Sequence, residues 1–369
     1  MVILNFDVDN FYEFDHFNIN LSYPKKLVKS SIPEEHLKGF PNFRYKKVVF
    51  VMGANATGKT TLGKSLMDVM NFINRKEYTS LVDVIKDPSR DASFVIDLAF
   101  DNSLVRVCGT VIANADRQYS SDSIKVSVHN EVIKENDSYE SCLKRLLTQE
   151  ESEAQDYIKE LEKVPKLSWM YRYPMSDSEV ANSSYKPIDD DRYLEILKAV
   201  LKVLDPRIID VSAVEDTEET FMIKYDSRRV MIEKSMVISG SISSGTAESI
   251  TAAQLIAAIK TGGYKFFYYD ERFAHVHSDS EKAFVAMLIS LLQDNDQLFI
   301  TSHNVGLLDM DVPKHSFVFL KRNEADNRVE CVYPSQYLKR NTDSLRNAVE
   351  NDLFGASPNL DQIYDIQGL

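Results

Sequence analysis

The fold of this chain is decided by the stretch Gly53-Ala54-Asn55-Ala56-Thr57-Gly58-Lys59-Thr60. The apolar run 47–52 precedes it and predicts a buried parallel strand. A helix is predicted to follow it, because apolar residues recur at helical spacing at Leu62, Leu66, Val69, Met70 and Ile73. Glycines between a strand and a helix let the backbone curl around an anion, which the helix N-terminus also attracts. The pattern is therefore typical of a phosphate-binding loop.

This loop predicts a nucleotide site. Lys59 is expected to reach the β- and γ-phosphates of ATP, and the Thr60 hydroxyl to ligate Mg²⁺. The residues predicted to contact ATP are Gly53, Ala54, Asn55, Ala56, Thr57, Gly58, Lys59, Thr60 and Thr61. The alternative is a glycine turn with an incidental lysine, and the strand before the loop and the helix after it favour the phosphate loop.

Composition and charge restrict the class of protein. The chain has 369 residues, 44% hydrophobic and 27% charged, which is the balance of a globular protein. Its net charge of −13 argues against a protein that binds duplex DNA over its whole surface. One small basic group, Arg44, Lys46 and Lys47, is interpreted as solvated residues that flank a strand.

The expected location is the cytoplasm, without membrane contact. No apolar run is long enough for a bilayer span, and the N-terminus lacks the features of a signal peptide. The three cysteines, Cys108, Cys142 and Cys331, form no CxxC pair, which argues against a disulfide framework or a zinc site.

Strand and helix patterns alternate along much of the chain and predict an α/β fold. We expect a mostly parallel sheet core, an antiparallel β lobe and a helical insertion. The lobe is predicted from two strands within 2–22 and a meander over 93–112 and 124–134. Residues 1–136 and 205–369 are predicted to form one discontinuous nucleotide-binding domain, and 137–204 a mostly helical insertion with a loop at 165–189.

Two later strand predictions end in polar residues. The run 266–269 ends in Asp270 and Glu271, and the run 298–300 is followed by Thr301, Ser302 and His303. Ligands gather at the carboxyl ends of strands in α/β sheets. We therefore expect Asp270 to join Thr60 around Mg²⁺, Glu271 to orient or deprotonate the attacking water, and His303 to contact the γ-phosphate or that water. Each also has a structural reading, as a strand-end turn or a structural histidine.

A serine- and glycine-rich segment, Ser243-Ser244-Gly245-Thr246, precedes the helix predicted over about 246–260. By itself it is a common helix cap. The order of phosphate loop, long insert, this segment, the acidic strand and the histidine strand resembles the ABC-type ATPase clan. Within that clan, the chain resembles the SMC, RecF and OLD-like branch, and is similar to compact bacterial AAA-domain ATPases of phage-defence and abortive-infection genes.

Shorter segments support the resemblance, which covers 1–134 and 205–369. Residues 10–14, Asn-Phe-Tyr-Glu-Phe, resemble the family's "NFRSF" strand, with Tyr12 in place of its arginine. Thr301-Ser302-His303-Asn304 resembles the histidine switch, and 345–358 resembles the "GRYGAxP" ending. The segment 272–277 differs from the family's usual sequence in the dimer-facing loop.

The resemblance implies a head-to-tail homodimer in which Ser243, Ser244, Gly245 and Thr246 cap ATP bound by the second subunit. ATP with Mg²⁺ would then hold the dimer closed and hydrolysis would release it, controlling a separate effector such as a nuclease in anti-phage defence. Nucleic acid contact is expected to be indirect. Two alternatives stay open: a RecF/SMC-like DNA repair or maintenance ATPase, and a nucleotide-gated scaffold with little turnover. A small-molecule P-loop kinase would not explain the signature segment or His303.

Overall fold

The computed structural model describes residues 1–25, 30–149, 156–172, 191–214, 220–233, 244–271, 277–323, 325–340 and 343–355. The chain forms two compact units. The first comprises residues 1–167 and 294–369, and the second comprises residues 168–293.

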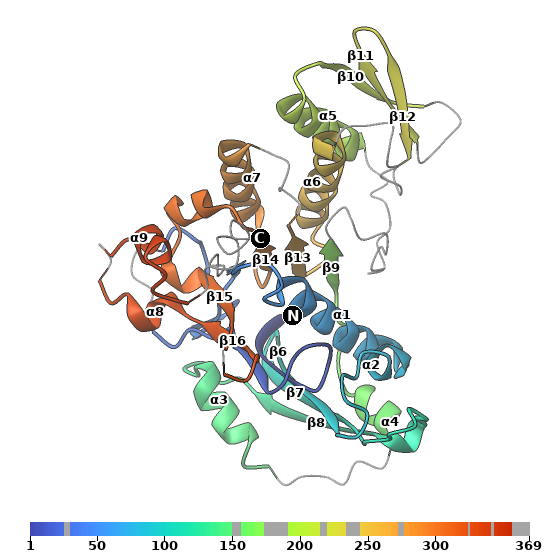
Figure 1. Cartoon of the computed structure of the whole chain (residues 1–369), viewed down its shortest axis with the longest axis vertical. Coiled ribbons are helices and arrows are strands. Elements are labelled where there is room, and N and C mark those ends of the chain that lie inside the picture. The colour runs from blue at the N-terminus through green and yellow to red at the C-terminus, as the bar shows by residue number, and fades with distance from the viewer. Residues whose placement is uncertain are drawn as a thin grey trace, which may run out of the picture. The chain divides into compact units, whose positions relative to one another are not determined.

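The first unit contains an antiparallel sheet with the strand order β2-β1-β6-β7-β8 (Figure 1). Its strands are β1 (Val2–Asp9), β2 (Phe17–Asn20), β6 (Ala92–Phe100), β7 (Ser103–Val111) and β8 (Ile124–Val132). The helices α3 (Tyr139–Leu146) and α4 (Tyr157–Leu161) lie against β8. The buried face of α3, with Tyr139, Cys142 and Leu146, packs into the same core as Val2 and Leu4 of β1.

A second, mostly parallel sheet in the first unit carries the phosphate loop. The strands β14 (Gln297–Thr301) and β15 (Phe317–Arg322) both run parallel to β5 (Val48–Met52), one on each side of it. The strand β16 (Val329–Val332) pairs antiparallel with β15. Every residue of β5 is buried, as an apolar strand covered on both faces requires.

The helix α1 (Lys59–Arg75) follows the loop and buries the apolar face predicted for it, Leu62, Leu66, Val69, Met70 and Ile73. Phe72 of α1 also packs edge-on against Phe94 of β6, with ring centroids 6.0 Å apart. The remaining short elements of this unit are α2 (Thr79–Val82), α8 (Pro334–Tyr337), α9 (Leu345–Glu350), the β3–β4 pair (His36–Leu37 and Phe40–Arg44), and three 3₁₀ turns at Ser121–Ser123, Val305–Asp309 and Lys314–Ser316.

The described residues of the second unit form a parallel strand pair, a small antiparallel sheet and three helices. The strand β9 (Trp169–Arg172) pairs with β13 (Phe266–Asp270), and the antiparallel sheet has the order β10-β11-β12 (Ile208–Ala213, Thr220–Tyr225 and Arg229–Glu233). The helix α5 (Asp191–Leu204) packs against β10 and against α6 (Ser244–Thr261), which also contacts α7 (Ser278–Leu291) (Figure 1).

Most predicted elements are confirmed, and one prediction is wrong. The loop predicted over 165–189 contains the buried strand β9. Four residues flanked by polar sequence carry little periodicity, and the partner strand β13 lies far along the chain. The predicted insertion 137–204 therefore contains α3, α4, α5 and this strand, and its separation as a domain stays a prediction. In the described ranges, no helix is both long and apolar enough to span a bilayer.

Candidate phosphate-loop site

The loop between β5 and α1 needs its two glycines at particular positions. Gly53 has φ 146° and Gly58 has φ 97°, and both lie in the region that side chains disfavour. A Cβ on Gly53 would lie 2.5 Å from the carbonyl oxygen of Leu320 and 2.8 Å from Oγ1 of Thr57. On Gly58 it would lie 3.2 Å from the Phe14 ring. The backbone conformation at Gly53, where the loop begins, is therefore available only to glycine. The conformation at Gly58, where the loop ends, strongly favours glycine.

Two side chains of the loop turn back onto its own backbone. The Lys59 ammonium donates to the carbonyl oxygens of Gly53 at 3.1 Å and Ala54 at 3.0 Å, and the residue is almost fully buried. The Thr57 hydroxyl donates to Ala54 at 2.8 Å. The lysine is thus held inside the curl, where a phosphate group bound by the loop would meet its charge. The residue types and this backbone geometry fit an ATP phosphate chain, with Lys59 and Thr60 as the polar side chains that would hold it and its Mg²⁺.

The predicted histidine, His303, follows β14, which pairs with β5 in the sheet that carries the phosphate loop. In the parallel register of β14 and β5, Thr301 lies opposite Val51. The strand β14 ends at Thr301, and His303 follows two residues later, just as the phosphate loop follows the end of β5. His303 is exposed. Asn304 has a local structural role, since its side chain accepts a hydrogen bond from Gly306 at 2.8 Å and caps the following 3₁₀ turn.

The segment 10–14, which resembles the family strand, lies beside the loop and is tightly anchored. Its Asn10 side chain donates to the carbonyl oxygens of Asp87, Arg90 and Asp91 and accepts from the Asp87 amide. The hydroxyl of Tyr12, which replaces the family's arginine, donates to Asp68 of α1 at 2.6 Å. Tyr12 therefore connects the segment to the helix that follows the loop.

Glu13 and Arg322 are further residues of the site, and neither was assigned a role from the sequence. Glu13 accepts a hydrogen bond from the Thr61 hydroxyl at 2.7 Å and forms an ion pair with Arg322. Arg322 donates through Nε to the Ala56 carbonyl oxygen at 2.7 Å. The pair thus connects the tip of the loop to the first turn of α1. Glu13 lies in the segment 10–14 that resembles the family strand, so the sequence drew attention to its neighbourhood. No sequence pattern indicated Arg322.

The acidic pair lies in the second unit. Asp270 ends β13 and is fully buried, and it accepts a hydrogen bond from the Tyr171 hydroxyl of β9 at 3.1 Å. Glu271 has φ 46°, a conformation that costs a non-glycine residue roughly 1 kcal/mol or more. Residues held in this way cluster at functional sites, and the roles predicted for both carboxylates stay predictions.

The structure describes only part of the predicted signature segment 243–246. Ser243 lies outside the described residues, as do 272–276 and the end of the chain from 356. The backbone of Ser244, Gly245 and Thr246 forms the first turn of α6.

The comparisons with known proteins find the fold in solved structures. No protein-family model matches the chain, and no curated protein matches it. An Smc head bound to the C-winged helix domain of ScpA is 13% identical, with a TM-score of 0.50 over 92% of this chain and 100% of that chain. An Smc head domain with an extended coiled coil, bound to the C-terminal domain of ScpA derived from Pyrococcus furiosus, is 12% identical, with a TM-score of 0.51 over 92% and 98%. The chain therefore has the α/β fold of SMC head domains, with a mostly parallel sheet and additional antiparallel sheets.

Proposed function

We propose that this protein binds ATP with Mg²⁺, hydrolyses it, and uses the cycle as a switch. The observation that carries the proposal is the loop between β5 and α1, whose positive-φ glycines and inward-turned Lys59 match what a phosphate chain requires. The likeness of the fold to SMC head domains supports the proposal, and in this chain the loop connects a buried strand to a helix.

The proposed roles follow from charge and position. Lys59 and the loop amides bind the phosphates, and Thr60 with Asp270 holds Mg²⁺, which would neutralise phosphate charge. Glu271 orients or deprotonates water, and His303, which follows the end of β14 beside β5, contacts the γ-phosphate or that water. These assignments rest on the residue types and on the resemblance described above.

We further propose that the switch is a dimer. Residues Ser243–Thr246 of one copy would cap the γ-phosphate held by the other, so ATP would favour the closed state by binding it more tightly. The Smc heads with this fold are described bound to domains of ScpA, and by analogy a separate partner is proposed here. The segment 137–204 would transmit the change to that partner, which we propose to be an effector such as a nuclease in anti-phage defence.

The binding step is tested with Lys59→Ala. We expect the variant to lose ATP binding in isothermal titration calorimetry, while Lys64→Ala, a charge removal further along α1, retains it. Unchanged ATP affinity in a folded Lys59→Ala protein would overturn the proposal.

Turnover and dimerisation are tested with Glu271→Gln. This variant should bind ATP, hydrolyse it far more slowly than wild type, and form a dimer detected by light scattering with ATP and Mg²⁺. Equal, near-zero turnover in both proteins would instead favour a nucleotide-gated scaffold. A monomer mass for Glu271→Gln with bound ATP would reject the dimer.

The biological role is tested separately. Cells that express the gene with its neighbouring genes should resist phage infection, and the Lys59→Ala version should not. Direct, salt-dependent binding of duplex DNA by the isolated protein would favour the repair or maintenance alternative.

A further inference from the structure

Lys46 is a buried lysine on the wall of a cavity in the first unit. It precedes β5, is 5% exposed, and contributes to a cavity of about 420 Å³. Its ammonium donates to the Asn20 carbonyl oxygen at 2.9 Å and lies 4.0 Å from the centre of the Tyr333 ring. Within the described ranges no carboxylate forms a salt bridge with it. The basic group predicted as solvated thus includes a side chain that is buried.

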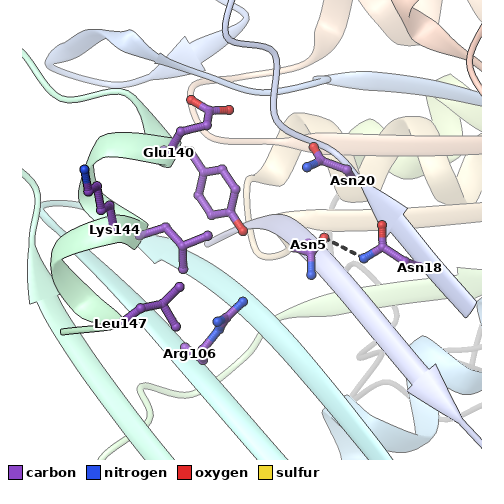
Figure 2. Close-up of a pocket in the computed structure, with 9 residues that line it drawn as sticks. Asn5, Asn18, Asn20, Arg106, Glu140, Lys144 and Leu147 are labelled. Carbon is purple, nitrogen blue, oxygen red and sulfur yellow. Dashed lines mark hydrogen bonds between the residues drawn. The ribbon is translucent and has the colours of Figure 1, made fainter. Parts of the chain in front are cut away.

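In a neighbouring cavity of the first unit, another cationic side chain, Arg106, is neutralised by a buried carboxylate. That cavity has a volume of about 500 Å³, and Arg106 and Lys144 are among the side chains that line it (Figure 2). Arg106 donates to the two carboxylate oxygens of the fully buried Asp97, at 2.7 and 2.9 Å. Asp97 also accepts from the Tyr139 hydroxyl at 2.6 Å.

Lys47, the next residue after Lys46, is also buried but has acidic neighbours. The negative charges of Glu34, Glu35, Asp294 and Asp296 raise its pKa against the larger, lowering effect of burial. At Lys46 burial lowers the pKa to about 7, and among the described residues the opposing charge is that of Cys331 and not of a carboxylate. Removing an ammonium from water without a counter-charge is unfavourable, so burial makes Lys46 lose its proton more readily, and an anion bound beside it would favour the charged form.

The rest of the cavity supplies groups that suit such an anion. Exposed Lys25 and Lys339 add positive charge at its rim, and Ser335 and Gln336 add hydrogen-bond donors. In the described part of the chain, the other titratable groups near Lys46 are Glu140, Tyr23, Tyr333 and Cys331. Glu140 accepts a hydrogen bond from Ser22 at 2.9 Å, and burial raises the pKa of the Cys331 thiol to about 12. Lysines therefore outnumber carboxylates in this cavity, although the whole chain carries a net charge of −13.

We propose that this cavity binds a small molecule through an oxyanion group, a phosphate or a carboxylate, with Lys46 as the counter-ion. The two lysines at the rim attract the anion, and the ammonium of the buried Lys46 binds it. The volume of the cavity leaves room for more than the oxyanion, so the natural ligand has a body beyond it.

The test uses inorganic phosphate and acetate as probes at pH 6.5 and constant ionic strength. It is performed in the Lys59→Ala background, so that the proposed nucleotide site does not bind the phosphate. Calorimetry reports binding, and acetylation of Lys46 by acetic anhydride, followed by peptide mass spectrometry, reports where the anion binds. We expect one of the anions to bind and to slow acetylation of Lys46 relative to Lys144. Phosphate binding assigns the phosphate class, and acetate binding the carboxylate class.

Three variants separate the site from general charge effects. Lys46→Met should weaken binding about tenfold or more, since a charge-assisted contact is lost, and should fold, because methionine suits a buried position. Lys144→Met makes the same change in the neighbouring cavity and should have no effect. Glu140→Gln should tighten binding several-fold by removing the negative charge at the rim. Failure of both anions to protect Lys46 at tens of millimolar, or equal binding by Lys46→Met, would overturn the proposal.

Discussion

The Nε atom of Arg322 donates a hydrogen bond to the carbonyl oxygen of Ala56 at 2.7 Å, across 266 residues of sequence. This contact joins the end of β15 to the tip of the phosphate loop. Glu13 pairs with the same guanidinium and also accepts from Thr61 in the first turn of α1. The loop is therefore held at both its tip and its exit by contacts within the chain, which reduces the ordering cost of binding.

We predict that Arg322→Ala weakens ATP binding by roughly tenfold, the loss expected when charge-assisted hydrogen bonds that hold a site are removed. Arg328→Ala is the matched control, because Arg328 lies between β15 and β16 and pairs with Asp326 two residues away. Calorimetric Kd values for ATP check the difference. Arg322→Lys should restore part of the affinity, and equal Kd values for wild type and Arg322→Ala would show that the contact does not position the loop.

Gly53→Ala should abolish nucleotide binding and lower the melting temperature. Its new Cβ meets the Leu320 carbonyl oxygen at 2.5 Å, and the φ of 146° is strained for alanine. Gly263→Ala is the control, because a Cβ at that position would have no atom within 4 Å and its φ lies outside the strained range. Differential scanning calorimetry with and without ATP measures both effects. A Gly53→Ala protein that binds ATP normally would contradict the geometry described for the loop.

Asp97→Asn should destabilise the fold by about 3–5 kcal/mol, because it leaves the Arg106 charge uncompensated at the base of the β lobe. Tyr139→Phe removes only one hydrogen bond to the same carboxylate and should cost about 1 kcal/mol. Urea unfolding curves give the two free energies of unfolding. Similar, small losses in both variants would show that the Arg106–Asp97 pair contributes little to stability.

The stability of the protein should increase with pH through the titration of Lys46. Its pKa is about 7 in the folded chain and about 10.5 when unfolded, so between these values the unfolded state binds more protons and stability rises with pH. Lys46→Met lacks this contribution. The free energy of unfolding of wild type relative to Lys46→Met should therefore increase from pH 7 to pH 9.5, with other titrating groups cancelling in the difference. A difference independent of pH would show that Lys46 keeps an ordinary pKa.

The sequence by itself determined the parts of this protein that depend on local chemistry. Gly53 and Gly58 specify a backbone curl that side chains disfavour, and the apolar spacing from Leu62 to Ile73 specifies the helix after it. The run 48–52 predicts a buried strand in the same way. These signals lie within a few residues of each other, so the phosphate loop and the α/β class could be predicted without coordinates.

Only the tertiary structure decided which distant residues meet. The register of β14 and β15 against β5 brings Thr301, two residues before His303, opposite Val51, and Arg322 contacts Ala56; no local pattern encodes that register. The strand β9 exists because β13 pairs with it, and Lys46 is buried because Asn20 and Tyr333 enclose it. Each of these features depends on packing between segments far apart in the chain, where the stabilising contact is made by the fold and not by the neighbouring residues.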